Sequence, residues 1–207
     1  MKLLLTNYRS LVFNRLMTTR EDLINALLSL GEEKGLANVS LSDIAMEVGI
    51  RKPSIYSHFE SKEALVDAAV LYCREQMKSR SFPVNFKAPD AQSLLASLVD
   101  SFLMTFAEAP LSSFLSITEQ QRMFDPRFAE VHNQLVSMMG ARIRVALEFC
   151  VQRSWLDIRD TDIASDFFTS AVMECLCNVI SPQQGEKTDT DWEIDRLVDG
   201  MLELFGI

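Results

Sequence analysis

Apolar residues recur every three or four positions along most of this chain, the spacing that one face of an α-helix requires. The pattern predicts helices over residues 19–34, 41–48, 62–80, 91–108, 110–123, 126–153, 160–180 and 190–205, with a short helix after Arg51. No segment alternates apolar and polar residues as a half-buried strand does. Glycine and proline are sparse, at 7 and 6 residues, which also favours long helices. The expected fold class is therefore all-α, with about nine helices.

Two of these helical patterns, between residues 40 and 60, are short and are separated by a tight turn. Ser40 is placed to cap the first, and Asp43 completes a pair like a capping box. Gly49 can adopt positive φ and therefore suits the end of that helix. Pro53 suits the first turn of the next helix, where its missing N–H is not needed. This layout predicts a helix-turn-helix, whose second helix can lie in a DNA major groove.

These residues resemble the DNA-binding domain of the TetR/AcrR family of bacterial transcriptional regulators. The resemblance runs from Thr18 to Arg80, and the family's fixed positions appear as Ile44-Ala45, Gly49-Ile50, Tyr56-Ser57-His58-Phe59 and Lys62-Glu63-Ala64-Leu65. It implies an N-terminal three-helix helix-turn-helix domain and a C-terminal helical domain for ligand binding and dimerisation. One departure is Arg51, where the family often has a Ser or Thr helix cap; a phosphate contact is the alternative role for this arginine.

Three segments follow from these patterns: an N-terminal extension at residues 1–17, a DNA-binding domain at 18–80, and an effector-binding and dimerisation domain at 81–207. The second boundary rests on the proline-containing stretch 81–90, which reads as a linker. Met17 directly precedes Thr18 and Glu21, a second capping-box pair. Three interpretations stay open for the first 16 residues: translation starts at Met17, they form a native amphipathic arm, or an arm with Lys2, Arg9 and Arg15 reaches a DNA minor groove.

Polar side chains are left on the outer face of the predicted second helix, where DNA would lie. Lys52 can reach a phosphate or a guanine edge, and the serines can meet bases or phosphates. By resemblance, Tyr56 contacts the DNA backbone, and Lys62, at the start of the following helix, contacts phosphate. The expected DNA-binding residues are Ser42, Arg51, Lys52, Pro53, Ser54, Tyr56, Ser57, His58 and Lys62.

Charge divides unevenly between the two halves of the chain. Residues 1–80 hold 11 Lys and Arg against 10 Asp and Glu, a net charge of +1, whereas residues 81–207 hold 9 against 19, a net charge of −10. The acidic half would be repelled by phosphate, so it is expected to point away from DNA. Since the first half is only balanced, docking should depend on geometry more than on bulk charge, with a modest salt dependence.

Aromatic and methionine side chains gather in the second half, which has 11 of the 13 phenylalanines and six of the ten methionines. In the family this resemblance points to, such helices enclose a small-molecule effector, and methionine adapts to irregular ligands. The expected ligand-binding residues are Phe102, Phe106, Met123, His132, Met139 and Trp155. Plain core packing is the alternative for the apolar residues, and an ordinary surface or satisfied buried histidine is the alternative for His132. Trp155 could cover the pocket or equally well cap the end of its helix.

The last two predicted helices leave little polar surface and form broad apolar faces. Two such helices from each of two chains make a four-helix bundle, so they are interpreted as the interface of a homodimer. The expected interface residues are Phe167, Phe168, Ala171, Cys175, Leu197 and Met201. The alternative is that both helices are buried against their own subunit.

Catalysis is not expected, because the chain has two histidines, seven glycines, no Ser-His-Asp arrangement and no Gly-rich phosphate loop. No cofactor, metal or membrane partner is expected, and the location is predicted to be cytoplasmic because no apolar run reaches the length of a membrane span. The resulting hypothesis is a ligand-responsive repressor. It binds palindromic operator DNA as a dimer and is released by a small hydrophobic or aromatic effector. An activator, or a DNA-bound adaptor that acts through a protein partner without an effector, is the alternative.

Overall fold

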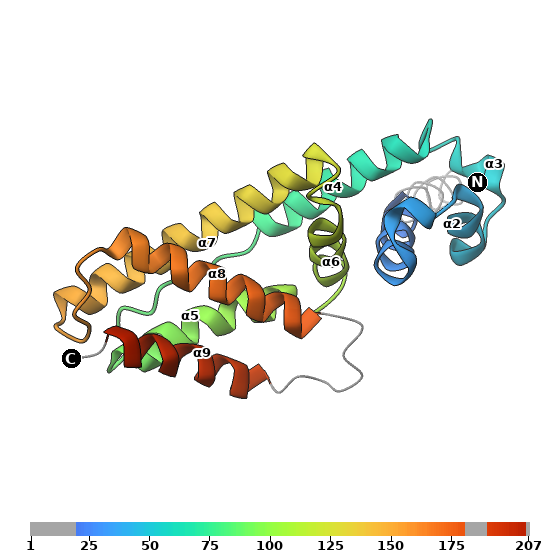
Figure 1. Cartoon of the computed structure of the whole chain (residues 1–207). Coiled ribbons are helices and arrows are strands. Elements are labelled where there is room, and N and C mark those ends of the chain that lie inside the picture. Colours follow the sequence, from blue (N-terminus) through green and yellow to red (C-terminus); the bar gives the residue numbers. More distant parts are fainter. Residues whose placement is uncertain (1–19, 181–189, 206–207) are drawn as a thin grey trace, which may run out of the picture. The chain divides into compact units, whose positions relative to one another are not determined.

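The computed structural model describes residues 20–180 and 190–205, and every regular element in these ranges is helical (Figure 1). The all-α prediction is confirmed. A first helix over residues 20–34 and a 3-10 turn, η1, Leu36–Asn38, precede α2, Leu41–Val48, α3, Lys52–Ile55, and α4, Lys62–Lys78. The predicted extension, the Met17 start and the Thr18 cap lie outside the described residues.

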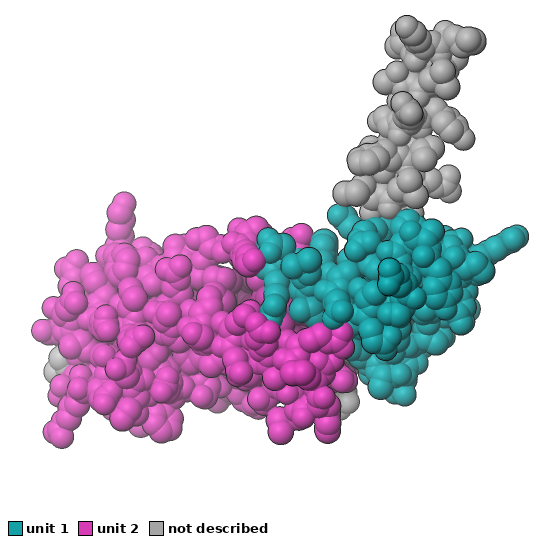
Figure 2. Space-filling model, turned by 90° about the horizontal axis from the view of Figure 1, so that it is seen from above, with its two compact units in different colours: residues 1–75 teal, residues 76–207 magenta. Residues whose placement is uncertain are grey.

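The chain separates into two compact units, residues 1–75 and 76–207, which Figure 2 colours differently. The boundary therefore falls within α4, before the stretch 81–90 that we expected to be the linker. The first unit has its own core, built from the first helix, α2, α3 and α4. Its fully buried side chains include Leu23, Leu27, Ile44, Ile55 and Leu65.

In its described residues, the second unit contains the end of α4 and five further helices. These are α5, Ala91–Phe106, α6, Leu111–Gln121, α7, Pro126–Gln152, α8, Thr161–Ile180, and α9, Thr190–Phe205. The most extensive packing in this unit joins α7 and α8, which run side by side (Figure 1). α5 packs against α9, α8, α7 and α6, and so lies at the centre. Buried aromatic rings fill this core, among them Phe102, Phe106, Phe114 and Phe128.

The helix starts of the second unit follow the sequence signals. Asp90 accepts a hydrogen bond from the Ser93 N–H at the start of α5, and Asp125 accepts one from the Arg127 N–H at the start of α7. Asp160 Oδ1 accepts from the N–H groups of Asp162 and Ile163 at the start of α8. These side chains satisfy backbone donors that the first turn of a helix leaves without partners.

Within the described residues, α8 is the one single helix long and apolar enough to cross a membrane by length and composition. The consecutive helices α5 and α6 pass the same test only as a pair, bent by 91°. Of the apolar window in α8, 44% is buried within the structure, and the core helix of a soluble protein passes the same test.

Candidate nucleic-acid interface

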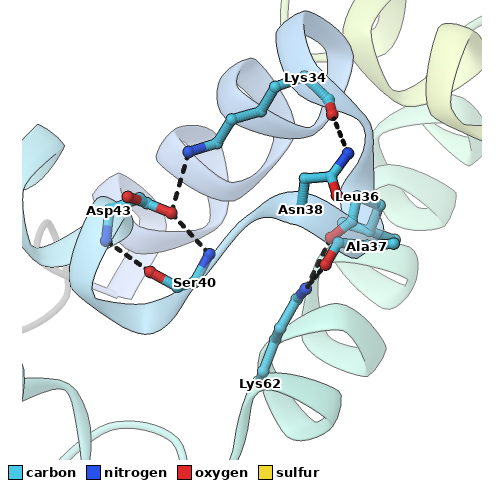
Figure 3. Close-up of polar contacts among 7 residues, drawn as sticks. All are labelled: Lys34, Leu36, Ala37, Asn38, Ser40, Asp43 and Lys62. Atoms are coloured by element: carbon cyan, nitrogen blue, oxygen red, sulfur yellow. Dashed lines mark hydrogen bonds and ion pairs between the residues drawn. The ribbon is translucent and has the colours of Figure 1, made fainter.

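Hydrogen bonds and an ion pair among Ser40, Asp43 and Lys34 hold the start of α2 in place (Figure 3). The Ser40 N–H donates to Asp43 Oδ2 at 2.8 Å, and the Asp43 N–H donates to Ser40 Oγ at 3.2 Å, so the predicted capping box is present. Lys34 Nζ, on the first helix, lies 2.9 Å from Asp43 Oδ2. The hydrogen bond from Lys34, followed by those from Ser40, lowers the pKa of Asp43 to about 2. One carboxylate thereby ties α2 to the first helix.

The turn between α2 and α3 passes through a left-handed residue. Gly49 has φ 73° and ψ 31°, a region that strains residues with a side chain. The Ile50 N–H donates to the Ala45 carbonyl at 2.9 Å, the bond that closes a helix after such a residue. Ile44 and Ala45 are both buried. The turn predicted from Gly49 is confirmed, and it redirects the chain into α3.

α3 rests on two buried side chains. Ile55 and Phe59, four positions apart, are 0% and 4% exposed and face the core. Arg51 precedes the helix in an extended conformation without a side-chain capping bond, and Pro53 lies in the first turn. Only Lys52–Ile55 is regular α-helix; residues up to His58 continue as a turn in which the His58 N–H donates to the Ile55 carbonyl. The regular part of the second helix of the helix-turn-helix is therefore only about one turn long.

The outer face of this segment holds most of the residues predicted to touch DNA. Exposed there are Arg51, Lys52, Pro53, Ser54, Tyr56 and Ser57, with Ser42 exposed on α2 and His58 half-buried. Tyr56 leaves 53% of its surface in solvent, although its ring could have packed inward. Ser57 Oγ donates to the Ser54 carbonyl at 2.7 Å and so already has one partner. The charged side chains of Arg51 and Lys52 can neutralise phosphates, and the exposed Tyr56 hydroxyl can donate a hydrogen bond to a phosphate oxygen.

Arg20, on the first helix, contacts the end of the segment from Arg51 to Phe59, which we call the recognition segment. The sequence patterns did not indicate this role for Arg20. Its Nη1 donates to the His58 carbonyl at 3.0 Å, and its guanidinium lies 4.3 Å from the centre of the Phe59 ring. Arginine makes such paired contacts well because the guanidinium is planar and has several donors. No local signal could have found this role, since 38 positions separate Arg20 from His58.

Lys62 has an internal role in addition to the predicted phosphate contact (Figure 3). Its Nζ donates to the Leu36 carbonyl at 2.6 Å and approaches the Ala37 carbonyl at 3.5 Å. Burial is the main cause of the lowered pKa of this ammonium group. Lys62 therefore connects the start of α4 to η1. A phosphate contact at this position stays a prediction, and any such contact would share an ammonium group that the fold already uses.

The residues predicted to bind a ligand do not all lie together. Phe102, Phe106 and Met139 are buried in the core, whereas Met123 is 77% exposed and lines no part of that core. His132 and Trp155 lie at opposite ends of α7. The helix rises by about 30 Å from His132 to Gln152, at about 1.5 Å per residue. Residues this far apart do not border one small pocket, and a ligand-binding role for either of them stays a prediction. Trp155 instead packs on Phe149, with ring centres 5.8 Å apart, where the helix ends.

His132 belongs to a small polar cluster between α6 and α7. Its Nδ1 lies 2.6 Å from Glu119 Oε1, and Arg122 Nη1 lies 3.4 Å from its Nε2. Arg122 Nε also lies 3.0 Å from Glu119 Oε2. The histidine thus has partners of its own, which fits the satisfied histidine named as an alternative.

The predicted dimer residues border an open groove of about 470 Å³ between α8 and α9. Phe167 is 71% exposed at its edge, and Ala171 and Leu197 are half-buried. Phe168 and Met201 also line the groove, although little of either is exposed. Cys175 is only 1% exposed and is not among the lining residues, so it packs inside its own subunit. Cys175 is buried because its position on α8 is on the side of the helix that faces the core.

Cysteine and metal chemistry find no support in the part of the chain that the structure describes. No group of three or more His, Cys, Asp and Glu side chains is placed there to hold a metal ion. Burial raises the pKa of the Cys73 thiol to about 12 and those of Cys150, Cys175 and Cys177 to about 11. These thiols are therefore protonated near neutral pH.

Comparison with known proteins agrees with this geometry. Residues 23–69 match the bacterial regulatory proteins of the tetR family. IcaR of Staphylococcus aureus (strain Newman), a biofilm operon icaADBC HTH-type negative transcriptional regulator, is 24% identical over 105 residues, which are 51% of this chain and 56% of IcaR. The chain thus spans little more than half the length of that relative.

Solved structures share the fold at low identity. A TetR transcriptional regulator from Chloroflexus aurantiacus J-10-FL is 21% identical with a TM-score of 0.70, and the match covers 94% of this chain and 99% of that one. A transcriptional regulator from Saccharomonospora viridis in complex with choline is 18% identical with a TM-score of 0.67, over 92% and 99% of the two chains. The family match and IcaR are regulators rather than enzymes.

Proposed function

Since this chain has at residues 23–69 the domain of the bacterial regulatory proteins of the tetR family, we propose that it represses transcription by binding palindromic operator DNA as a homodimer. A small hydrophobic or aromatic effector then releases it. The observation that carries the proposal is the outer face of α3 and of the turn after it, where Lys52 and Tyr56 are exposed while Ile55 and Phe59 are buried. A repressor that binds operator DNA in this way would act in the bacterial cytoplasm, where the DNA lies.

Repression, rather than activation, is favoured by the relative IcaR, which is named a negative regulator. A repressor of this kind needs only to occupy its operator, so it requires no activating surface for another protein. The residues proposed to make the contacts are those on and beside α3, with Lys52 and Tyr56 toward phosphates and bases.

The dimer is supported by the groove between α8 and α9. Its lining is mostly apolar, and Phe167 and Leu204 beside it are 71% and 77% exposed. Contiguous exposed apolar surface of this kind usually marks an interaction site. A second copy offers the same face, which a two-fold axis can pair with itself. Two recognition segments would then meet half-sites about 34–36 Å apart, or further apart by whole turns.

For effector control we propose the apolar interior of α5, α6 and α7, where Phe102, Phe106 and Met139 are buried and are the candidate contact residues. The choline-bound regulator from Saccharomonospora viridis has a similar fold, so this architecture can accommodate a small molecule. An effector would favour one dimer geometry over another, and such coupling between sites typically amounts to about 1–3 kcal/mol.

The test is selection of bound sequences from random DNA by the purified full-length protein at about 0.15 M salt, close to physiological ionic strength. We expect a palindrome whose half-sites are whole helical turns apart. The variants Lys52→Ala and Tyr56→Ala should keep the helical circular dichroism spectrum and lose the selected motif. Lys87→Ala, an exposed lysine of the second unit, controls for the loss of a positive charge.

Recovery of no motif by a folded, dimeric protein would overturn the proposal. If the motif is found but no small molecule in a metabolite screen releases the DNA, the effector part fails, and the adaptor or activator interpretation takes its place.

A further inference from the structure

A second candidate ligand site lies outside the core, in a crevice between α7 and α8. The crevice has a volume of about 370 Å³ and is lined by Val136, Ser137, Gly140, Ala141, Arg144, Asp162, Ser165, Asp166, Thr169 and Ser170. None of the residues discussed above for the effector lines it. Seven of these ten residues have polar or charged side chains, so this crevice differs in chemistry from the apolar groove between α8 and α9.

The hydroxyl group of Thr169 is the unusual feature of this crevice. Thr169 is 3% exposed, and its Oγ1 is buried with no hydrogen-bond partner. Hydroxyl groups inside helices usually donate to the carbonyl four residues earlier, as Thr105, Thr118 and Ser170 do here at 2.8–2.9 Å. A buried polar group without a partner destabilises a fold by about 1–3 kcal/mol. An external partner for this hydroxyl would remove that cost.

Gly140 keeps the space beside this hydroxyl open. A Cβ atom at position 140 would lie 3.4 Å from Thr169 Oγ1 and 4.0 Å from Ser165 Oγ. Ser165 Oγ itself donates to the Gly140 carbonyl at 2.9 Å. The two helices thus approach closely at Gly140, and two hydroxyl groups of α8 face the position where its side chain is missing.

The charges at the rim define which ligand chemistry fits. Arg144 Nη1 donates to Asp162 Oδ1, and Asp166 adds a second carboxylate, so the lining is acidic overall. Carboxylates and hydroxyl groups together suit a ligand that carries ammonium donors. Quaternary ammonium ions are usually recognised by aromatic rings, and no aromatic side chain is among the lining residues.

We propose that the crevice between α7 and α8 binds a small aliphatic amine. Its ammonium group lies at Asp162 and Asp166, and a further hydrogen-bonding group of the ligand reaches the hydroxyl groups of Thr169 and Ser165. The site is separate from the interior effector position proposed above, and it requires no bound DNA.

The experiment is isothermal titration of the full-length protein with putrescine, a linear diamine, at low salt. Butanediol, which has the same length and no charge, is the matched ligand control. We expect saturable binding of one putrescine per chain. Asp166→Asn removes a charge-assisted partner, and affinity should fall roughly tenfold or more. Asp100→Asn, which removes an exposed carboxylate from α5, should leave the affinity unchanged.

Thr169→Val gives an independent readout because it removes the hydroxyl group and keeps the shape. Affinity for putrescine should fall, while the melting temperature of the free protein should stay equal or rise, since a buried group without a partner is gone. The proposal is overturned if putrescine does not saturate, if all four proteins bind it alike, or if butanediol binds as tightly. Equal binding by the wild type and the three variants would show that putrescine is attracted by the overall negative charge of the protein and not by this crevice.

Discussion

Among single residues, Asp43 has the most consequential titration. Its pKa is lowered to about 2, first by the hydrogen bond from Lys34 and then by those from Ser40. A lowered pKa in the fold means that the carboxylate stabilises the protein above its unfolded pKa of about 3.9. That contribution is lost as pH falls through about 2.

Asp43→Asn should therefore lower the melting temperature of the first unit at neutral pH, and the difference from wild type should shrink as pH falls from about 4 toward 2. Thermal unfolding followed by circular dichroism over this pH range measures it. Asp22→Asn, in the exposed part of the first helix, is the control for loss of a charge. A difference that is constant with pH would show that the carboxylate's charge is not the stabilising feature.

Arg20 should act on DNA binding through the position of His58 and Phe59 rather than by touching phosphate. Removing the guanidinium by Arg20→Met takes away a hydrogen bond and a cation–π contact, each worth about 1 kcal/mol or less. We expect operator affinity to fall by roughly tenfold. The slope of affinity against salt distinguishes the roles, because a lost phosphate contact would reduce it by about one. An unchanged slope supports positioning, and a reduced slope contradicts it.

At the scale of elements, the turn between α2 and α3 depends on one backbone conformation. A Cβ atom at Gly49 would meet no atom within 4 Å, so the effect of a side chain there is backbone strain alone. Gly49→Ala should therefore lower the free energy of unfolding by about 1–2 kcal/mol. Gly49→Asn should lower it less, because asparagine adopts this region more readily. Equal losses in urea unfolding would argue against strain as the cause.

Local sequence signals predicted the elements well because caps and turns depend on neighbours in the chain. Ser40, Asp43 and Gly49 each act within a few residues, and each one is found in its predicted place. The end of α3 was the exception among the elements. Tyr56, Ser57 and His58 were expected to be helical, but the segment tightens into a turn where Phe59 must reach the core.

Contacts between distant segments could not be predicted from those signals. Lys62 bonds to the Leu36 carbonyl across 26 positions, and nothing local indicates that its ammonium group is used inside the fold. The predicted ligand-binding residues are dispersed in the structure for a similar reason. Apolar residues such as Met123 and Trp155 were grouped by composition, whereas helix length separates Trp155 from His132 and leaves Met123 in solvent.

For the whole molecule, the proposed dimer depends on whether exposed apolar surface is covered by a second copy. Phe167→Glu places a charge on the edge of the groove between α8 and α9, where burial without a partner is costly. We expect this variant to sediment as a monomer and to bind the selected operator far more weakly, because one half-site then supplies all the affinity. Met104→Glu is the matched control, since Met104 is 66% exposed on α5 outside this groove.

The two variants separate dimerisation from general solubility. If both stay dimeric, the groove between α8 and α9 is not the interface, and the operator geometry proposed above loses its basis. If Phe167→Glu is monomeric but binds the full palindrome as tightly as wild type, then operator affinity does not depend on dimerisation. The dimer proposal is supported if Phe167→Glu loses both dimerisation and tight operator binding while Met104→Glu keeps both. That result would link the exposed phenylalanine on α8 to the pairing of two DNA-binding segments on one operator.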